Sequence, residues 1–255
     1  MTTSLDVMGL RKRLHAELTA YLDRPHRTAL HRAAARKQLV DMFKATRRGA
    51  KDAWALLDDL ADKGVMTASD LKGALRDQLS PLQSNRCCFC RRWLANNGYA
   101  RQIEHILPRK HFPQFSAHFW NLAIVCIDCN SLKKAKIWGS IDTKRRRYPL
   151  PASVKTWFHP RFHSYDEHVR FVRIEANGLA VVVFVGKTEQ GRFLCKELLR
   201  HIAMKEMLVA SNPVLSACAS SIDDYQQLAG ADKGAGLRAF QEALAQSIVR
   251  LVHKP

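Results

Sequence analysis

Two Cys-x-x-Cys turns constrain the fold of this chain more than any other feature of its sequence. The first turn contains Cys87 and Cys90, and the second contains Cys126 and Cys129. A turn of this spacing places two thiolates on one side of a tight bend, and two such turns complete a tetrahedral zinc site. The alternative is a set of buried free thiols or disulfides. We expect a structural Zn²⁺ that joins two distant segments.

The segment between the two turns is long enough to hold structure of its own. Residues 100–106 predict a strand, which Pro108 ends, and a basic, aromatic loop follows. Residues 119–125 predict a second strand that leads into the second cysteine turn, and residues 130–136 predict the first turns of a helix. The expected order is strand, loop, strand and helix.

At this point the sequence resembles a known family. Glu104-His105-x-x-Pro108, then Asn121-Leu122, then Cys126-x-x-Cys129-Asn130 with Lys133 resemble the motif of the HNH endonucleases, which have a ββα-metal fold with zinc knuckles. The motif positions fall on His105, Asn121 and Asn130, an HNN variant. The resemblance covers roughly residues 85–140, about a fifth of the chain. Glu104 replaces the usual Asp, and Asn130 replaces a frequent His.

The resemblance implies a catalytic role for four residues. His105 would be the general base, because an imidazole can take a proton from water near neutral pH. Glu104 and Asn130 would hold one Mg²⁺ or Mn²⁺ through their oxygen atoms. Asn121 would orient the loop or the His105 ring. Since neighbouring residues of a regular strand point to opposite faces, Glu104 and His105 reach one site only if the strand end bends.

The charge of the chain indicates a polyanionic substrate. The net charge is +18, and residues 81–150 contribute +10 of it. A positive field concentrates nucleic acid and makes its binding depend on salt. The basic run at residues 144–147 is alternatively a solvated linker. We expect phosphate contacts from basic residues around the motif, namely Arg109, Lys110, Lys133, Lys134, Lys136, Arg145 and Arg146.

The rest of the chain predicts a mainly helical α+β protein in three regions. Residues 1–80 predict four helices, the last capped at Ser69-Asp70 and ended by Pro81. Residues 81–150 form the motif region. Residues 151–255 predict a β-hairpin around Asn177-Gly178, a helix over 193–207 and a last helix over 237–251.

Several functional classes are excluded or favoured by what the chain contains. It has no G-x-x-x-x-G-K-[ST] loop, so it is not itself a P-loop ATPase. It has no apolar run of about 20 residues and no signal-peptide pattern, so we expect no membrane span. Cysteines in metal-like pairs favour a reducing cytoplasm over a disulfide scaffold.

These expectations combine into a metal-dependent endonuclease that acts on double-stranded DNA. Stand-alone nucleases of similar appearance belong to anti-phage defence or restriction systems, sometimes beside an ATPase partner, and the resemblance implies such a setting. Two alternatives stay open, a non-catalytic zinc-dependent module that binds nucleic acid and an RNase toxin. The motif acts on a phosphodiester that DNA and RNA share, so it does not separate the two, and the sequence predicts no oligomeric state.

Overall fold

The computed structural model describes residues 7–23, 29–48, 53–58, 67–94, 100–176 and 179–206. The chain divides into two compact units, Met1–Glu167 and His168–Pro255. The expected helix over 237–251 and the Asn177-Gly178 turn lie outside the described residues. In the described part of the chain, no helix has both the length and the hydropathy needed to cross a membrane.

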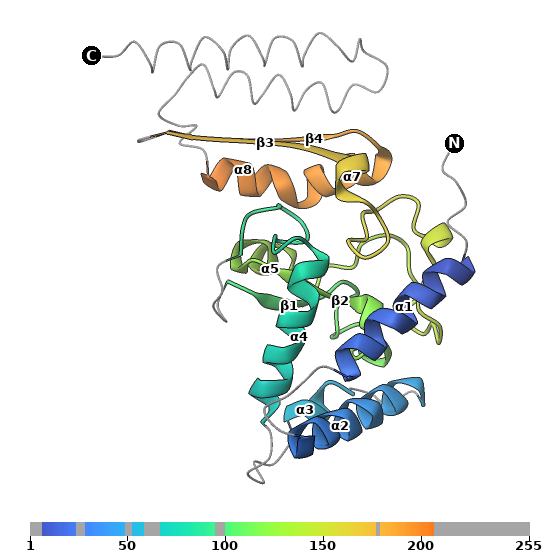
Figure 1. Ribbon diagram of the computed structural model, residues 1–255. Helices are drawn as coiled ribbons and strands as arrows, with labels where there is room; N and C mark the ends of the chain where they lie inside the picture. The colour runs from blue at the N-terminus through green and yellow to red at the C-terminus, as the bar shows by residue number, and fades with distance from the viewer. Residues whose placement is uncertain are drawn as a thin grey trace. The chain divides into compact units, whose positions relative to one another are not determined.

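The first unit begins with helices whose apolar faces pack together. Leu39 and Met42 of the second helix are almost fully buried, as are Tyr21 of the first and Leu71 of the fourth. The Tyr21 hydroxyl donates to the Leu71 carbonyl at 3.2 Å, which links the first helix to the fourth. These helices are α1 (Val7–Leu22), α2 (Ala29–Arg47), α3 (Ala55–Asp58) and α4 (Ala68–Leu82) (Figure 1).

Helix α4 begins and ends slightly outside the expected bounds. Its N-cap is Thr67, whose side chain accepts from the Asp70 backbone N–H while the Asp70 carboxylate accepts from the Thr67 N–H. This capping box corrects the expected cap at Ser69-Asp70, because the acidic residue is the partner of the cap. Pro81 lies inside the last turn, and the helix ends at Leu82.

A two-stranded antiparallel sheet and a helix follow in the expected order. Strand β1 (Gln102–His105) pairs with β2 (Leu122–Val125) so that His105 lies opposite Leu122. Residues 119–121, expected in the strand, form a short 3₁₀ turn before β2. Helix α5 (Ile127–Lys133) starts earlier than expected because Cys126 caps it, its sulfur accepting from the Cys129 N–H.

A buried glutamine joins α4 to the free edge of β2. The Gln83 side-chain amide donates to the Ile124 carbonyl at 2.8 Å, and its oxygen accepts from the Ile124 N–H at 2.8 Å. The side chain therefore replaces a third strand by pairing with both backbone groups of one residue. This contact sets α4 beside the sheet (Figure 1).

The second unit contains the expected hairpin and the helix that follows it. Strand β3 (Val169–Ala176) pairs antiparallel with β4 (Leu179–Gly186) along its whole length. A helical segment follows, made of α7 (Glu189–Leu194), a π-helical stretch (Cys195–Leu199) and α8 (Arg200–Glu206). It begins four residues before the expected start, because Thr188 caps it through the Gly191 N–H. The described residues are thus an α+β protein with two small antiparallel sheets.

Candidate metal centre and functional pocket

The four predicted cysteine ligands form one buried cluster. Their sulfur atoms all lie within 4.8 Å of one another, and the sulfurs of Cys90 and Cys126 are 3.7 Å apart. A tetrahedral site with Zn–S bonds of about 2.3 Å separates its sulfurs by roughly 3.8 Å. The donor set and its spacing therefore fit Zn²⁺, as expected for Cys87, Cys90, Cys126 and Cys129.

The shifted pKa values of the cysteine thiols also suit a bound cation. Hydrogen bonds with Cys126 raise the pKa of Cys90 and of Cys129. Burial alone raises the pKa of Cys87, but hydrogen bonds from Cys126 and Cys129 outweigh it and hold that pKa well below its usual value. Sulfurs that share protons in this way release them when a metal binds.

Contacts around the cluster hold the two cysteine turns together. The Arg92 guanidinium pairs with the Asp128 carboxylate at 2.6 Å, and these residues follow the first turn and lie within the second. Phe89, inside the first turn, is fully buried and packs edge-on against Trp138 at 5.2 Å between ring centroids. The ion pair therefore joins the two turns in addition to the sulfurs, and the aromatic contact packs the first turn against the segment that follows α5.

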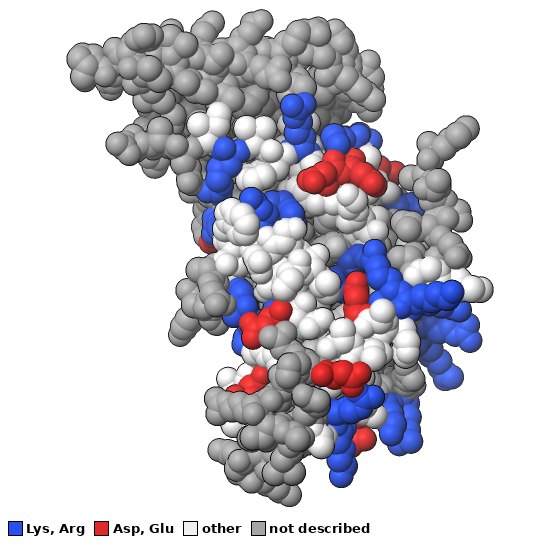
Figure 2. Space-filling model, in the orientation of Figure 1, with Lys and Arg blue, Asp and Glu red and all other residues white. Residues whose placement is uncertain are grey.

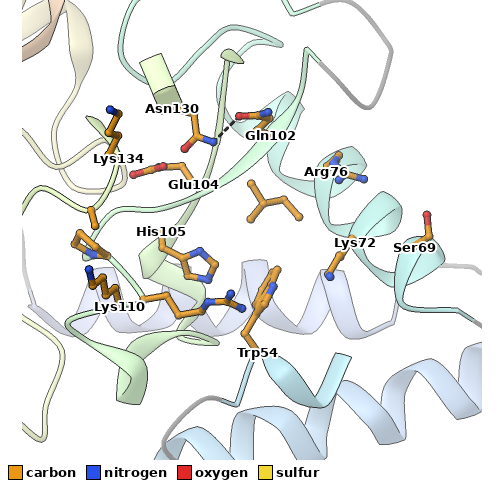
Figure 3. Close-up of a pocket in the computed structure, with 14 residues that line it drawn as sticks. Trp54, Ser69, Lys72, Arg76, Gln102, Glu104, His105, Lys110, Asn130 and Lys134 are labelled. Carbon is orange, nitrogen blue, oxygen red and sulfur yellow. Dashed lines mark hydrogen bonds between the residues drawn. The ribbon is translucent and has the colours of Figure 1, made fainter. Parts of the chain in front are cut away.

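A pocket of about 780 Å³ opens beside the sheet. It is lined by residues from four segments that are distant in sequence, and Figure 3 draws them as sticks. Six of the residues predicted to be functional line this one pocket, namely Glu104, His105, Arg109, Lys110, Asn130 and Lys134. Glu104 and His105, which follow one another at the end of β1, both reach it.

His105 is held by a backbone carbonyl on one side of its ring. Its Nε2 lies 2.9 Å from the Ser116 carbonyl oxygen. Because a carbonyl can only accept, Nε2 carries the hydrogen and Nδ1 carries the ring lone pair. Trp54 meets the imidazole at an interplanar angle of 84°, with 4.8 Å between ring centroids. The two contacts set the tautomer and the orientation of the ring.

Glu104 forms a buried ion pair with Lys133. The two side chains are 4% and 0% exposed, and Lys133 Nζ lies 2.5 Å from the Glu104 Oε1. Nζ also donates to the His105 carbonyl at 3.3 Å and lies 5.2 Å from the Trp138 ring centroid. Burial raises the pKa of Glu104, and the neighbouring ammonium opposes that rise.

This geometry corrects the expectation that Lys133 contacts nucleic acid. Its side chain points into the protein, where a carboxylate that is removed from water needs a cation. Lys134, the next residue, is exposed and lines the pocket. Lys136 and Arg146 are exposed and Arg145 is half-buried, and none of the three lines the pocket.

The two asparagines of the motif have different environments. Asn121 is fully buried and outside the pocket lining, and its side chain bonds the backbone N–H of Leu107 at 2.7 Å and the carbonyls of Leu107 and Phe115 at 3.0 Å. It therefore fastens the loop that follows β1, one of the roles expected for it. Asn130 lines the pocket, and its amide donates to the Gln102 side chain (Figure 3). That bond uses the side-chain nitrogen of Asn130, so the side-chain oxygen of Asn130 is the atom that can act as a ligand or acceptor.

A buried relay supports Asn121 from behind, and the sequence did not reveal it. His159 is fully buried, and burial holds its pKa well below the usual value. Its Nδ1 accepts from the Arg161 N–H at 3.2 Å, so Nε2 carries the hydrogen and faces the Tyr148 hydroxyl at 2.8 Å. That hydroxyl donates to the Asn121 Oδ1 at 3.1 Å. The relay thus braces the loop that carries the Ser116 carbonyl.

Three further residues of the pocket were also missed. Trp54 precedes α3, and Lys72 and Arg76 lie on α4. The spacing of Lys72 and Arg76 indicates one helix face, but no feature of the sequence says which face of α4 borders the motif.

Figure 2 shows lysine and arginine in several separate groups on one face of the molecule. Surface charge alone does not locate the site.

Comparison with known proteins gives little further information. No protein-family model matches the chain, and no solved structure matches it. Among curated proteins, Protein ea31 of Escherichia phage lambda is 29% identical to this chain over 73 residues. The match spans 29% of this chain and 23% of that protein, so less than a quarter of the relative is covered. Its name states no activity.

Proposed function

We propose that this chain is a metal-dependent endonuclease of the HNH type, with a ββα-metal fold, that hydrolyses phosphodiester bonds in double-stranded DNA. The observation that carries the proposal is one pocket lined by His105, Glu104 and Asn130. An imidazole and two oxygen donors are the groups that metal-assisted hydrolysis of a phosphodiester needs. The four-cysteine cluster and the cationic pocket rim support it further.

His105 supplies the base in this proposal. The Ser116 carbonyl keeps the hydrogen on Nε2, so Nδ1 accepts the proton of the attacking water. The relay from His159 through Tyr148 to Asn121 holds the loop in place, and the base therefore keeps its direction. The water attacks phosphorus as it transfers its proton to Nδ1. The bond from phosphorus to the leaving oxygen breaks, and that oxygen keeps the electron pair and takes a proton from solvent.

The oxygen donors fit a hard divalent cation. Glu104 and the carbonyl oxygen of Asn130 would hold Mg²⁺ or Mn²⁺, since both line the pocket and both are ligand types that these ions prefer. Such an ion supplies charge neutralisation on the phosphate and on the leaving oxygen. Lys133 already neutralises part of the Glu104 charge, so the protein alone would bind the ion weakly. Phosphate oxygens of the substrate would complete its ligand shell.

The zinc in this proposal is structural. Four cysteine sulfurs fill a tetrahedral shell, which leaves no open position for water or substrate. The site joins the segment before β1 to the segment after β2, so it sets the position of Asn130 relative to His105. Loss of the metal would then disrupt the pocket and not only the cluster.

We place the enzyme in the cytoplasm, as an effector of an anti-phage defence or restriction system that works with an ATPase partner. The free, buried cysteines of the described residues suit a reducing compartment. The motif resemblance supports both the defence setting and the ATPase partner, and the sequence has no nucleotide-binding loop of its own.

One observation favours a second function. The Glu104 carboxylate is paired with Lys133, an arrangement that also suits a protein that binds nucleic acid through its cations without a catalytic metal. A zinc-dependent binding module would keep its affinity for nucleic acid after loss of His105 and would cut nothing with any metal. Cleavage assays separate the two functions.

The test compares supercoiled plasmid, linear duplex and single-stranded RNA as substrates. Each is incubated with the purified protein and Mg²⁺, Mn²⁺ or no divalent ion, and with the His105→Ala variant. Metal-dependent DNA cutting that the variant lacks is the expected result. Cutting of RNA alone would move the assignment to an RNase. Tight, salt-sensitive binding by both proteins without any cutting would establish the binding module.

A further inference from the structure

Helix α4 lies outside the HNH-like segment, yet one of its faces lines the pocket. Ser69, Lys72 and Arg76 all border the cavity. Residues three and four apart share a helix face, so the three side chains form one continuous wall. None of them belongs to the motif that carries the proposed chemistry.

The α4 wall faces a second cationic wall across the pocket. In Figure 3, Ser69, Lys72 and Arg76 lie on one side of His105, and Lys110 and Lys134 lie on the opposite side. The proposed base therefore lies between two positive surfaces that come from different parts of the chain. A small substrate needs one such surface, whereas a strand with repeated phosphates can use both.

The positive charge at Arg76 is only partly balanced by the protein. Arg101, whose charge adds to that of Arg76, is itself paired with Asp77 at 2.9 Å. Within the described part of the chain, the Nε of Arg76 has no hydrogen-bond partner. Two guanidinium groups near one carboxylate leave a net positive charge, which suits an additional anion.

The dimensions of the wall match a nucleic-acid backbone. Residues 69–76 extend along about 10 Å of helix axis, at about 1.5 Å per residue. One DNA strand advances about 3.4 Å along the duplex axis per nucleotide, so this wall covers about three nucleotides. The pocket, at about 780 Å³, is far larger than a single phosphate needs.

We propose that α4 is the second wall of the substrate site, where Lys72 and Arg76 bind backbone phosphates of a DNA strand that runs over His105. Arg109, Lys110 and Lys134 bind phosphates of the same strand on the opposite side. The inference rests on the proposed nuclease function and deepens it, because phosphates held on both sides of the base make the reacting bond an internal one. It assigns substrate binding to a helix outside the motif.

The test is the salt dependence of DNA binding by the full chain, measured without divalent ions so that no cleavage is needed. A fluorescein-labelled DNA duplex is titrated by anisotropy between 50 and 200 mM salt. The double variant Lys72→Gln/Arg76→Gln should flatten the slope of log K against log salt by about 2, since each phosphate contact contributes about 0.9. Its affinity at 0.1 M salt should fall about tenfold to hundredfold.

The matched control removes the same charge elsewhere. Arg11 and Lys12 are exposed on α1 and do not line the pocket, so Arg11→Gln/Lys12→Gln should leave the slope unchanged. Lys72→Arg should retain the wild-type slope, because it keeps the cation. Circular dichroism melting confirms that each variant is folded.

The outcomes separate this inference from the proposed function. If the double variant flattens the salt slope but the wild type never cuts DNA, the α4 wall is supported and the nuclease function is refuted. If the wild type cuts DNA and the double variant leaves the salt slope unchanged, the nuclease function is supported and the α4 wall is refuted. An equal change in the α1 control, or no measurable DNA binding by the wild-type chain, would also overturn the wall.

Discussion

Replacing Lys133 with methionine should destabilise the protein strongly, because it leaves the Glu104 carboxylate buried without a cation. The two side chains are 0% and 4% exposed, so water cannot replace the lost ammonium. Removing one partner of a buried pair costs about 3–5 kcal/mol. Methionine has a similar length and can pack beside Trp138, so little of the loss should come from a cavity.

The pH dependence of the loss identifies its cause. Burial raises the pKa of Glu104, and removal of Lys133 takes away the main opposing effect. When the folded-state pKa exceeds the unfolded one, the stability that the carboxyl group contributes is complete below the unfolded pKa and is lost as pH rises through the folded pKa. The deficit of the variant relative to wild type should therefore grow between pH 5.5 and pH 8.

The assay is urea unfolding in zinc-containing, magnesium-free buffer at both pH values. It compares the wild type with Lys133→Met, Glu104→Gln and the double variant. The double variant should regain most of the stability that Lys133→Met loses, because no buried charge then remains unpaired. A loss below about 1 kcal/mol at pH 8, an equal loss at both pH values, or simple additivity in the double variant would refute the reasoning.

Three further substitutions test contacts that stabilise the fold. Cys90→Ser should abolish stoichiometric zinc binding and unfold the region around the cluster, as seen by metal analysis and circular dichroism; unchanged melting with full activity would exclude the zinc site. Gln83→Glu should cost about 2–3 kcal/mol in urea unfolding, because an acceptor then faces the Ile124 carbonyl, while equal stability would exclude the edge pairing. Gly139→Ala should cost about 2–4 kcal/mol, since φ is +76° and a Cβ would lie 2.5 Å from the Trp157 ring; a thermal melt like that of wild type would contradict this.

The sequence predicted the parts of this protein that depend on local spacing. The four cysteine ligands follow from two short repeats, and the structure brings their sulfurs together. The strand, strand and helix order follows from apolar runs and the breaker at Pro108, and the later hairpin follows from alternation around an Asn-Gly pair. Each signal is contained within a few residues, so tertiary contacts were not needed to read it.

What the sequence did not predict depends on contacts between distant segments. The sequence predicts Lys133 as a surface cation, whereas the structure buries it in an ion pair with Glu104. Lys72 and Arg76 line the pocket because contacts such as that of Gln83 set α4 against the sheet. The hydrogen bond from Tyr148 to Asn121 joins residues 27 positions apart, and no periodic pattern in the sequence predicts it. Such pairs are set by packing, which single-sequence patterns do not encode.

The errors at the ends of helices have a different cause. Thr67 and Thr188 both cap through a backbone N–H three residues later, and each helix begins before its first apolar stripe. Apolar periodicity marks the buried face of a helix and says little about where the backbone hydrogen bonds start. Cap geometry, and not hydrophobic spacing, sets those bounds.

The most direct test of the central claim is chemical rescue of the proposed base. Plasmid cleavage is measured with excess protein and Mg²⁺ or Mn²⁺ for the wild type, His105→Ala, and the control His111→Ala, which does not line the pocket. The account predicts that His105→Ala loses about 10²–10⁴-fold in rate, that added imidazole restores part of it, and that His111→Ala cuts normally. Wild-type cutting by His105→Ala would contradict the account.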